Sequence, residues 1–149
     1  MGALKRQVGS IWYAETDDAL DDSGYVLMLK TTGNVAKCTA GVQPIGVNYM
    51  STKNPITESA ESGVRVGIVS DGVAEVQYNL GDGDDDIAIG DLVGTKDANA
   101  AGTVKKLTLD TTDAGTLANS LKCIVGVALE SATAPGTGKI KVLLRLGRA

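Results

Sequence analysis

The densest group of side chains that could do chemistry is the acidic run Asp82-Gly83-Asp84-Asp85-Asp86. Its first, third and fifth residues are carboxylates at alternate positions, which offer the hard oxygen ligands that Ca²⁺ binds at the start of an EF-hand loop. That loop also needs a glycine at its sixth position and a glutamate at its twelfth, where this chain has Ile87 and Val93. We therefore predict a solvated turn without a metal, with a Ca²⁺ site as the alternative.

A second candidate is the segment Ala134-Pro135-Gly136-Thr137-Gly138-Lys139, which resembles the end of a phosphate-binding loop. The full motif requires a glycine five residues before Gly138 and a serine or threonine after Lys139, but the chain has Thr133 and Ile140 there. The motif also opens a helix, whereas an alternating strand pattern follows here. We predict a hairpin loop and no nucleotide.

The remaining reactive side chains do not form a catalytic set. The chain has no histidine, which excludes His-based triads, imidazole general bases and His-ligated zinc. Ser70-Asp71 is typical of a turn. Cys38 and Cys123 stand in apolar stretches and are expected to be small buried hydrophobes, with a bridge between them left open. We predict that the protein is not an enzyme and uses no cofactor.

Charge and hydropathy restrict the partners further. The 149 residues carry a formal net charge of −4, from 14 basic and 18 acidic side chains. Such a balance argues against a phosphate-collecting surface, so nucleic acid is not an expected partner. The N-terminus lacks the apolar run of a signal peptide, and no segment approaches the roughly 18 apolar residues of a membrane span. We expect a soluble product made in the cytoplasm, with no membrane partner.

The elements that would position these residues are mostly strands. Apolar residues alternate with polar ones at residues 64–68 and 140–146, which is the period of a half-buried strand. Ser70-Asp71-Gly72 predicts a tight hairpin turn after the first of them, with a returning strand near residues 73–78. Glycine-rich clusters recur every 8–12 residues or so, as in sandwiches and barrels. Only residues 57–62 and 114–121 could be helical, and we predict an all-β protein.

The sequence also repeats itself. Residues 33–39 and 102–108 share the pattern Gly-x-Val-x-Lys-apolar-Thr, and residues 45–48 and 125–128 share apolar-Gly-Val. The second copy has 11 extra residues between its two motifs, which matches a polar insert at 110–120 that reads as a loop. We predict two similar β units, at about residues 19–79 and 88–146, packed into one barrel-like or sandwich-like body.

The N-terminal stretch differs from the rest of the chain. Lys5, Arg6, Trp12 and Tyr13 place two cations and the only tryptophan ahead of the first clear strand. Trp and Tyr are favoured interface anchors, so residues 1–14 are predicted to form an arm, with Lys5, Arg6, Trp12 and Tyr13 as its contact residues, that docks on a neighbouring protein surface. The alternative is an ordinary first strand packed on the core. In this division residues 15–149 form a single β domain.

Four segments together resemble the capsid decoration, or head-stabilising, proteins of tailed bacteriophages. These segments are Gly90-Asp91-Leu92-Val93, Gly102-Thr103-Val104, Ile124-Val125-Gly126-Val127-Ala128-Leu129-Glu130 and Gly138-Lys139-Ile140-Lys141-Val142-Leu143-Leu144. The likeness covers roughly residues 88–146, and residues 82–86 and 110–120 depart from it. It implies a β-barrel-like homotrimer on the outer surface of an icosahedral virion, which clamps neighbouring major capsid subunits.

The composition leaves one other class of function to compare with capsid decoration. A β-sandwich binding module for glycans or Ca²⁺ is the alternative. Glycan sites usually stack sugars on exposed aromatic rings, and this chain has one Trp, four Tyr and no Phe. We therefore expect a structural virion protein whose partners are the major capsid protein and further copies of itself.

Overall fold

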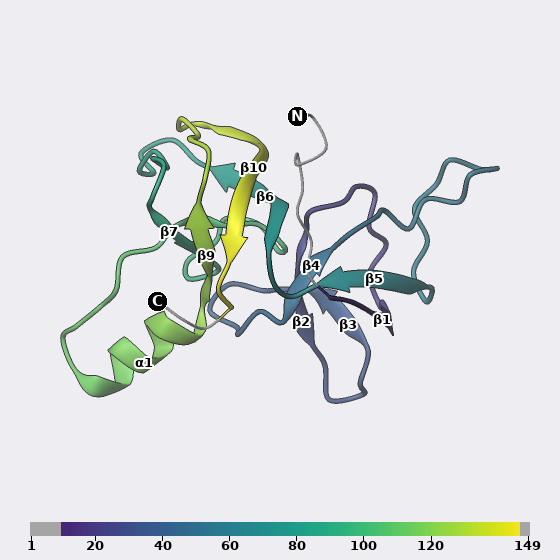
Figure 1. Ribbon diagram of the computed structural model, residues 1–149, viewed down its shortest axis with the longest axis horizontal. Helices are drawn as coiled ribbons and strands as arrows, with labels where there is room; N and C mark the ends of the chain where they lie inside the picture. The colour runs from purple at the N-terminus through teal and green to yellow at the C-terminus, as the bar shows by residue number, and fades with distance from the viewer. Residues whose placement is uncertain (1–9, 147–149) are drawn as a thin grey trace.

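The computed structural model describes residues 10–146, which form ten strands and one helix (Figure 1). The strands are β1 Ile11–Glu15, β2 Val26–Leu29, β3 Val35–Lys37, β4 Gly46–Asn48, β5 Arg65–Val69, β6 Val73–Leu80, β7 Leu92–Gly94, β8 Lys105–Lys106, β9 Ile124–Ala128 and β10 Gly136–Leu144. The helix is α1, Ala114–Lys122. The prediction of an all-β fold is confirmed. No helix within the described residues is long and apolar enough to cross a membrane.

The ten strands form two antiparallel sheets of five with the same topology. The first sheet has the order β1-β5-β4-β2-β3, and the second has the order β6-β10-β9-β7-β8. Each sheet therefore uses five consecutive strands in the order first, fifth, fourth, second, third. We call β1–β5 unit 1 and β6–β10 unit 2. The predicted construction from two similar β units is confirmed.

The equivalence extends to the pairing of single residues. Gly46 pairs with Leu27 in unit 1, and Gly126 pairs with Val93 in unit 2, each across the second and fourth strands. In both units the first strand also reaches the third through one parallel bridge, from Thr16 to Val35 and from Tyr78 to Val104. These bridges curl each sheet toward a half-closed barrel.

The predicted boundaries of the units need correction. The turn at Ser70-Asp71-Gly72 exists, but β5 and β6 on its two sides belong to different sheets. β5 cannot accept β6 as a partner because its two edges already pair with β1 and β4. The chain instead leaves the first sheet at this turn, where Gly72 has φ +79°, and β6 pairs with β10. Residues 73–79, expected in the first unit, therefore begin the second.

The two candidate helices have different outcomes. Residues 114–121 lie in α1, so the insert at 110–120, expected as a loop, is largely helical. Asp113 starts this helix because its side chain accepts a hydrogen bond from the Thr116 N–H, while the Thr116 hydroxyl bonds back to the Asp113 backbone. Residues 57–62 are not helical: they belong to a loop that is closed by a bridge from Lys53 to Ala60.

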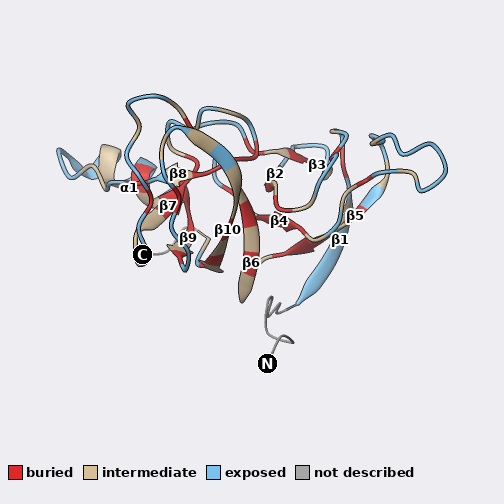
Figure 2. Cartoon of the chain, turned by 90° about the horizontal axis from the view of Figure 1, so that it is seen from above, coloured by how far each residue is buried: buried red, intermediate tan, exposed pale blue. Residues whose placement is uncertain are grey.

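The two units share a core (Figure 2). The inside of unit 1 is filled by one cluster: Leu20, Leu27, Val35, Val66 and Ile68. A larger cluster fills unit 2 and continues onto the opposite face of the first sheet, where it takes in Val26, Cys38, Val47 and Val69. A third, smaller cluster of Leu107, Cys123 and Ile124 packs with Leu121 of α1. The outer apolar face of unit 1 is thus buried by its neighbour.

Backbone hydrogen bonds also cross the seam between the units. The Gln77 N–H of β6 donates to the Gly24 carbonyl (2.8 Å), and the Val26 N–H donates to the Gly102 carbonyl (2.8 Å). The Lys139 ammonium of β10 lies 2.7 Å from a carboxylate oxygen of Asp22. The seam therefore combines apolar burial with directional polar contacts, which fix one unit on the other.

Candidate functional site

Within residues 10–146 no strand pairs with the outer edge of the first strand, which we call the β1 edge and define as residues Ile11–Glu15. β1 is the outermost strand of its sheet. Its apolar side chains are unusually exposed, with 37% of Ile11, 36% of Trp12 and 60% of Tyr13 open to solvent. In Figure 2 the strand is mostly pale blue beside the buried interior of its sheet. An exposed apolar sheet edge is a template for pairing with another chain.

This placement corrects the expected arm. Trp12 and Tyr13 pair with Ile68 and Gly67 of β5, in a ladder that begins at Ile11. The boundary of an arm at residue 14 is therefore wrong, because residues 11–14 belong to the sheet. The alternative, a first strand packed on the core, is right about the strand: Ala14 packs against the core of unit 1, while Trp12 and Tyr13 keep exposed surface. Lys5 and Arg6 lie outside the described residues.

The aromatic side chains of the β1 edge are held in place. The Trp12 Nε1–H donates to the Ser70 hydroxyl (2.8 Å), which in turn donates to the Ile45 carbonyl (2.9 Å). The Arg65 guanidinium lies 5.6 Å from the centre of the Tyr13 ring, within range of a cation–π contact. The side chains are therefore ordered before any partner arrives, which lowers the entropy cost of binding. Ser70 acts here as a support for Trp12.

The acidic run at 82–86 is tied to its own surroundings. One oxygen of Asp84 accepts hydrogen bonds from the Gly81 N–H (2.7 Å) and the Asn99 amide (2.6 Å). The other oxygen accepts from the Lys105 ammonium (2.7 Å). Asp86 accepts from the Ala134 N–H (2.7 Å). These bonds engage both oxygens of Asp84 and one oxygen of Asp86, and residues 10–146 contain no group of three possible metal ligands.

Asp84 should therefore stabilise the fold in a pH-dependent way. Its hydrogen bonds with Lys105, Asn99 and Gly81 lower its pKa from 3.8 to about 2. A lowered pKa in the folded state means that the carboxylate stabilises the protein above about pH 4, and that this stabilisation disappears as the pH falls toward 2. We expect Asp84→Asn to lower the melting temperature by a few degrees at pH 7 and to have little effect near pH 2.

Calorimetric melting of Asp84→Asn from pH 2 to 7 tests this prediction. Asp85→Asn is the matched control, because Asp85 is the exposed neighbour of Asp84. A constant difference between Asp84→Asn and the wild type at every pH would contradict the role given to the carboxylate. A titration with millimolar Ca²⁺ should also give no saturable heat.

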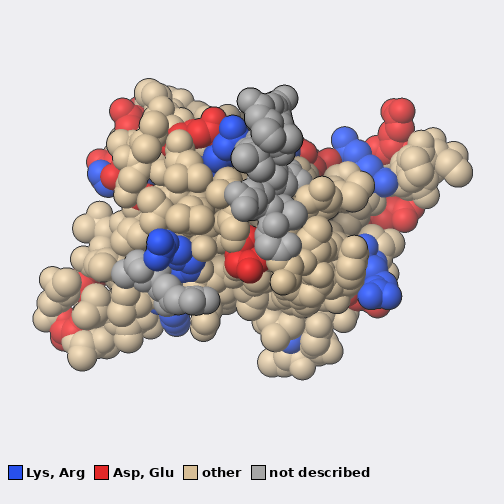
Figure 3. All heavy atoms as spheres, viewed as in Figure 1, with Lys and Arg blue, Asp and Glu red and all other residues tan. Residues whose placement is uncertain are grey.

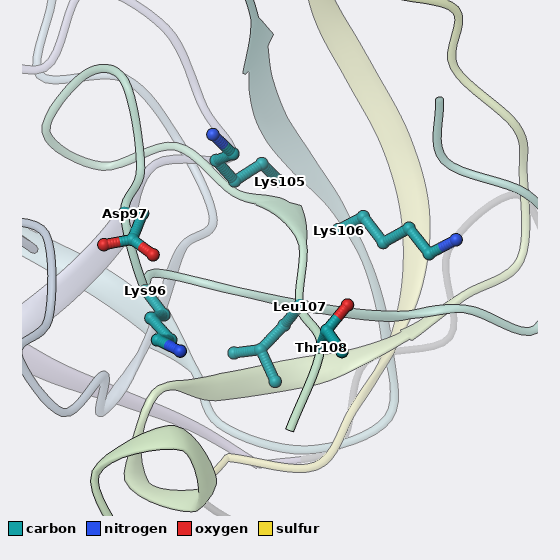
Figure 4. A pocket seen from close by; sticks show the side chains of 6 residues that line it. All are labelled: Lys96, Asp97, Lys105, Lys106, Leu107 and Thr108. Atoms are coloured by element: carbon teal, nitrogen blue, oxygen red, sulfur yellow. The ribbon is translucent and has the colours of Figure 1, made fainter. Parts of the chain in front are cut away.

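A small open pocket of about 170 Å³ lies between β8 and the loop before it, lined by Lys96, Asp97, Lys105, Lys106, Leu107 and Thr108 (Figure 4). It is smaller than the ~300 Å³ at which ligand pockets usually begin. The figure shows the ammonium groups of its three lysines pointing in different directions. Two of them already have partners, since Lys105 pairs with Asp84 and Lys106 lies 3.7 Å from Asp91. The pocket therefore does not present a convergent set of donors to an anion.

The lysine of the phosphate-loop-like segment has a structural partner. Gly136–Leu144 is β10, which forms an antiparallel hairpin with β9. The prediction of a hairpin loop is wrong for Gly136–Lys139, which belong to β10 and pair with β6, and of this segment only Ala134 and Pro135 lie in the connection between β9 and β10. The Lys139 ammonium donates to Asp22 (2.7 Å) and to the Ser23 hydroxyl (3.1 Å) across the seam. No helix follows this segment among the described residues, so the geometry of a phosphate-binding loop is absent there.

The two cysteines are free and buried, as expected, and no disulfide joins them. Burial raises the pKa of the Cys38 thiol to about 12, so it stays protonated at neutral pH. A protonated, buried thiol is a poor nucleophile.

Within residues 10–146 the most prominent candidate site is therefore the β1 edge, a surface suited to contact with another protein. Figure 3 shows charges of both signs scattered over one face, with wide uncharged areas between them. Sequence reasoning missed the partners of Asp84, because Asn99 and Lys105 lie 15 and 21 residues away along the chain. The exposure of Trp12 and Tyr13 could be suspected only from their residue types. No family model and no curated protein matches this chain.

Proposed function

We propose that the protein is a structural virion component that decorates the outer surface of an icosahedral phage capsid and bridges major capsid subunits, as a homotrimer. The β1 edge is the single observation that carries the proposal, because it is the free edge of a sheet and presents three exposed apolar side chains. The resemblance of residues 88–146 to capsid decoration proteins is the reason for proposing a capsid as the partner.

The two-unit construction supports the same function. Two sheets that share a core and exchange backbone hydrogen bonds make a stiff body, as a component under load from packaged genome requires. A contact that is repeated over many equivalent positions on a shell does not need a deep pocket, because several weak contacts made together reach high avidity.

A β-sandwich binding module for glycans is the second candidate, and the exposed Trp12 and Tyr13 favour it. Sugars stack on a flat platform of aromatic rings. Trp12 and Tyr13 are consecutive residues of one strand, so their side chains point to opposite faces of the sheet. They do not form a common platform, which leaves capsid decoration as the better account.

A sedimentation assay tests the proposal. Capsid particles are made without this protein, by deletion of its gene from the virus that carries it. The particles are then mixed with the purified protein and pelleted. We expect saturable binding with a fixed number of copies per major capsid subunit. No binding to these particles, together with saturable binding to a glycan array, would contradict the proposal and favour the second candidate.

A further inference from the structure

The seam inside the chain shows what covers the edge of a first strand. The edge of β6, the first strand of unit 2, lies against the residues that precede β2 in unit 1. There the Gln77 N–H donates to the Gly24 carbonyl (2.8 Å). Gly24 has φ +90°, and a Cβ atom at this position would lie 2.9 Å from the Glu75 carbonyl oxygen. Only glycine therefore permits this close approach.

The repeat gives each partner in this contact a counterpart. The third and fifth residues of β6 are Glu75 and Gln77, and those of β1 are Tyr13 and Glu15. The counterpart of Gly24 is Gly90, which precedes β7 and has φ +93°. The backbone around the two glycines matches as well. Each donates its N–H to the last residue of the fourth strand of its unit, with 3.0 Å for Gly24 and 2.8 Å for Gly90.

Among the residues that the structure describes, nothing covers either counterpart. A Cβ atom at Gly90 would meet nothing within 4 Å, and the preceding Ile89 is 71% exposed. On β1, the Thr16 N–H donates to Val64 on the β5 side (2.9 Å). Because successive backbone groups of a strand point to opposite edges, the Glu15 N–H points outward, where the Gln77 N–H points in unit 2. The β1 edge and β7 lie toward opposite ends of the molecule (Figure 1).

The outer faces of the two sheets also differ in burial: the face of unit 1 is covered and that of unit 2 is partly exposed. In unit 1 this face is buried by unit 2, and its members Val26, Val47 and Val69 are at most 1% exposed. Their counterparts in unit 2 are half-buried: Leu92, Val127 and Leu143. Unit 2 thus carries the same apolar surface that unit 1 uses at the seam, and this surface is only partly covered.

We call residues 88–90, which precede β7, the Gly90 corner. We infer that the β1 edge of a second copy of this chain docks on the Gly90 corner of the first copy, as β6 docks on Gly24 within the chain. The inference deepens the self-association in the proposed function and rests on it only for the expected number of copies, three. The contact joins two different surfaces, so it repeats head to tail and closes into a ring when the rotation allows.

The contact between copies replaces three polar side chains of the seam with less polar ones, while Glu15 and Arg65 stand where the seam has Gln77 and Lys139. At the seam, Asp22 and Ser23 face Gln77 and Lys139. In place of Asp22 and Ser23, the Gly90 corner has Ala88 and Ile89. In place of Glu75, the β1 edge has Tyr13, whose ring lies near Arg65. Ile89 and Tyr13 are both largely exposed in the single chain, and their burial is a reason for two copies to associate.

Two complementary variants test the inference. Gly90→Ala places a Cβ atom where the Tyr13 carbonyl of the second copy would lie. Glu15→Pro removes the outward N–H from β1, and proline is tolerated at such an edge position. Gly83→Ala is the control, because Gly83 has φ +86° and open space around it. We expect the wild type and Gly83→Ala to be oligomers by light scattering, and each complementary variant to be a monomer of 15.2 kDa.

The mixture of the two variants is the decisive measurement. Each has one intact half of the contact, so an equimolar mixture should give a one-to-one heterodimer and nothing larger. A mixture that stays monomeric would contradict the head-to-tail contact, as would a wild-type monomer or variants that remain oligomeric. If circular dichroism shows that Glu15→Pro is unfolded, Tyr13→Lys takes its place. Shell binding by a monomeric wild type would overturn this inference and the trimer, while leaving decoration of the shell standing.

Discussion

Replacement of Gly126 by alanine should remove about 3 kcal/mol from the free energy of unfolding. Gly126 lies in the middle of β9, and the added Cβ atom would collide with the Leu143 carbonyl and lie 2.7 Å from the side chain of Val142. Both obstacles belong to β10, which pairs with β6 and β9 on its two sides and has no room to move. Such a loss is a large part of the 5–15 kcal/mol that stabilises a typical domain.

Gly46→Ala should have a comparable effect, because Gly46 is the counterpart of Gly126 in unit 1. Its Cβ atom would collide with the Ile68 side chain and lie 2.8 Å from the Val69 carbonyl oxygen of β5. Gly67→Ala is the matched control within a strand, since its nearest contacts are ordinary ones at 3.4 Å. Urea denaturation of the three variants measures the difference. Equal stability of Gly126→Ala and Gly67→Ala would contradict this account of the packing.

A monomeric variant should cover capsid shells far less well than the wild type, although it differs from the wild type at a single residue. Several linked copies bind a lattice with an avidity that exceeds the affinity of one copy by ~10²–10⁴. Gly90→Ala should therefore need at least about a hundredfold higher concentration for half-occupancy of particles made without the protein. Gly83→Ala controls for backbone strain at a glycine with positive φ, and it should bind like the wild type.

Half-occupancy concentrations from sedimentation compare the two variants directly. If Gly90→Ala is monomeric in solution yet occupies shells as well as Gly83→Ala, then self-association does not contribute to decoration. If both bind weakly, backbone strain rather than the lost contact explains the effect.

The strands and the repeat were predictable from sequence because both leave local patterns. The alternation at Arg65–Val69 marks a strand with one buried face, and the Gly-Val motifs at Gly46 and Gly126 mark equivalent positions in two strands. Which strand pairs with which leaves no such pattern. The turn at Gly72 looks like a hairpin turn, and only the occupation of both edges of β5 sends the next strand to another sheet.

The candidate site was less predictable for a related reason. The types of Trp12 and Tyr13 suggested a contact surface, but exposure depends on what the rest of the chain covers. β6 and β1 are equivalent strands, and only β6 has another unit beside it, at Gly24. The edge of β1 is exposed because no second unit lies beside it, and this depends on long-range packing. The residue types around Trp12 therefore could not show whether this stretch is an arm or an exposed strand.

A cryo-electron microscopy map of particles from the source of the gene tests the central claim, that this protein decorates the shell, most directly. The account predicts density on the outer surface that fits the two-unit body at repeated positions bridging major capsid subunits, with β1 of one copy beside Gly90 of the next. A bare outer surface on intact particles, or density for this protein only inside the shell or on the tail, would contradict it.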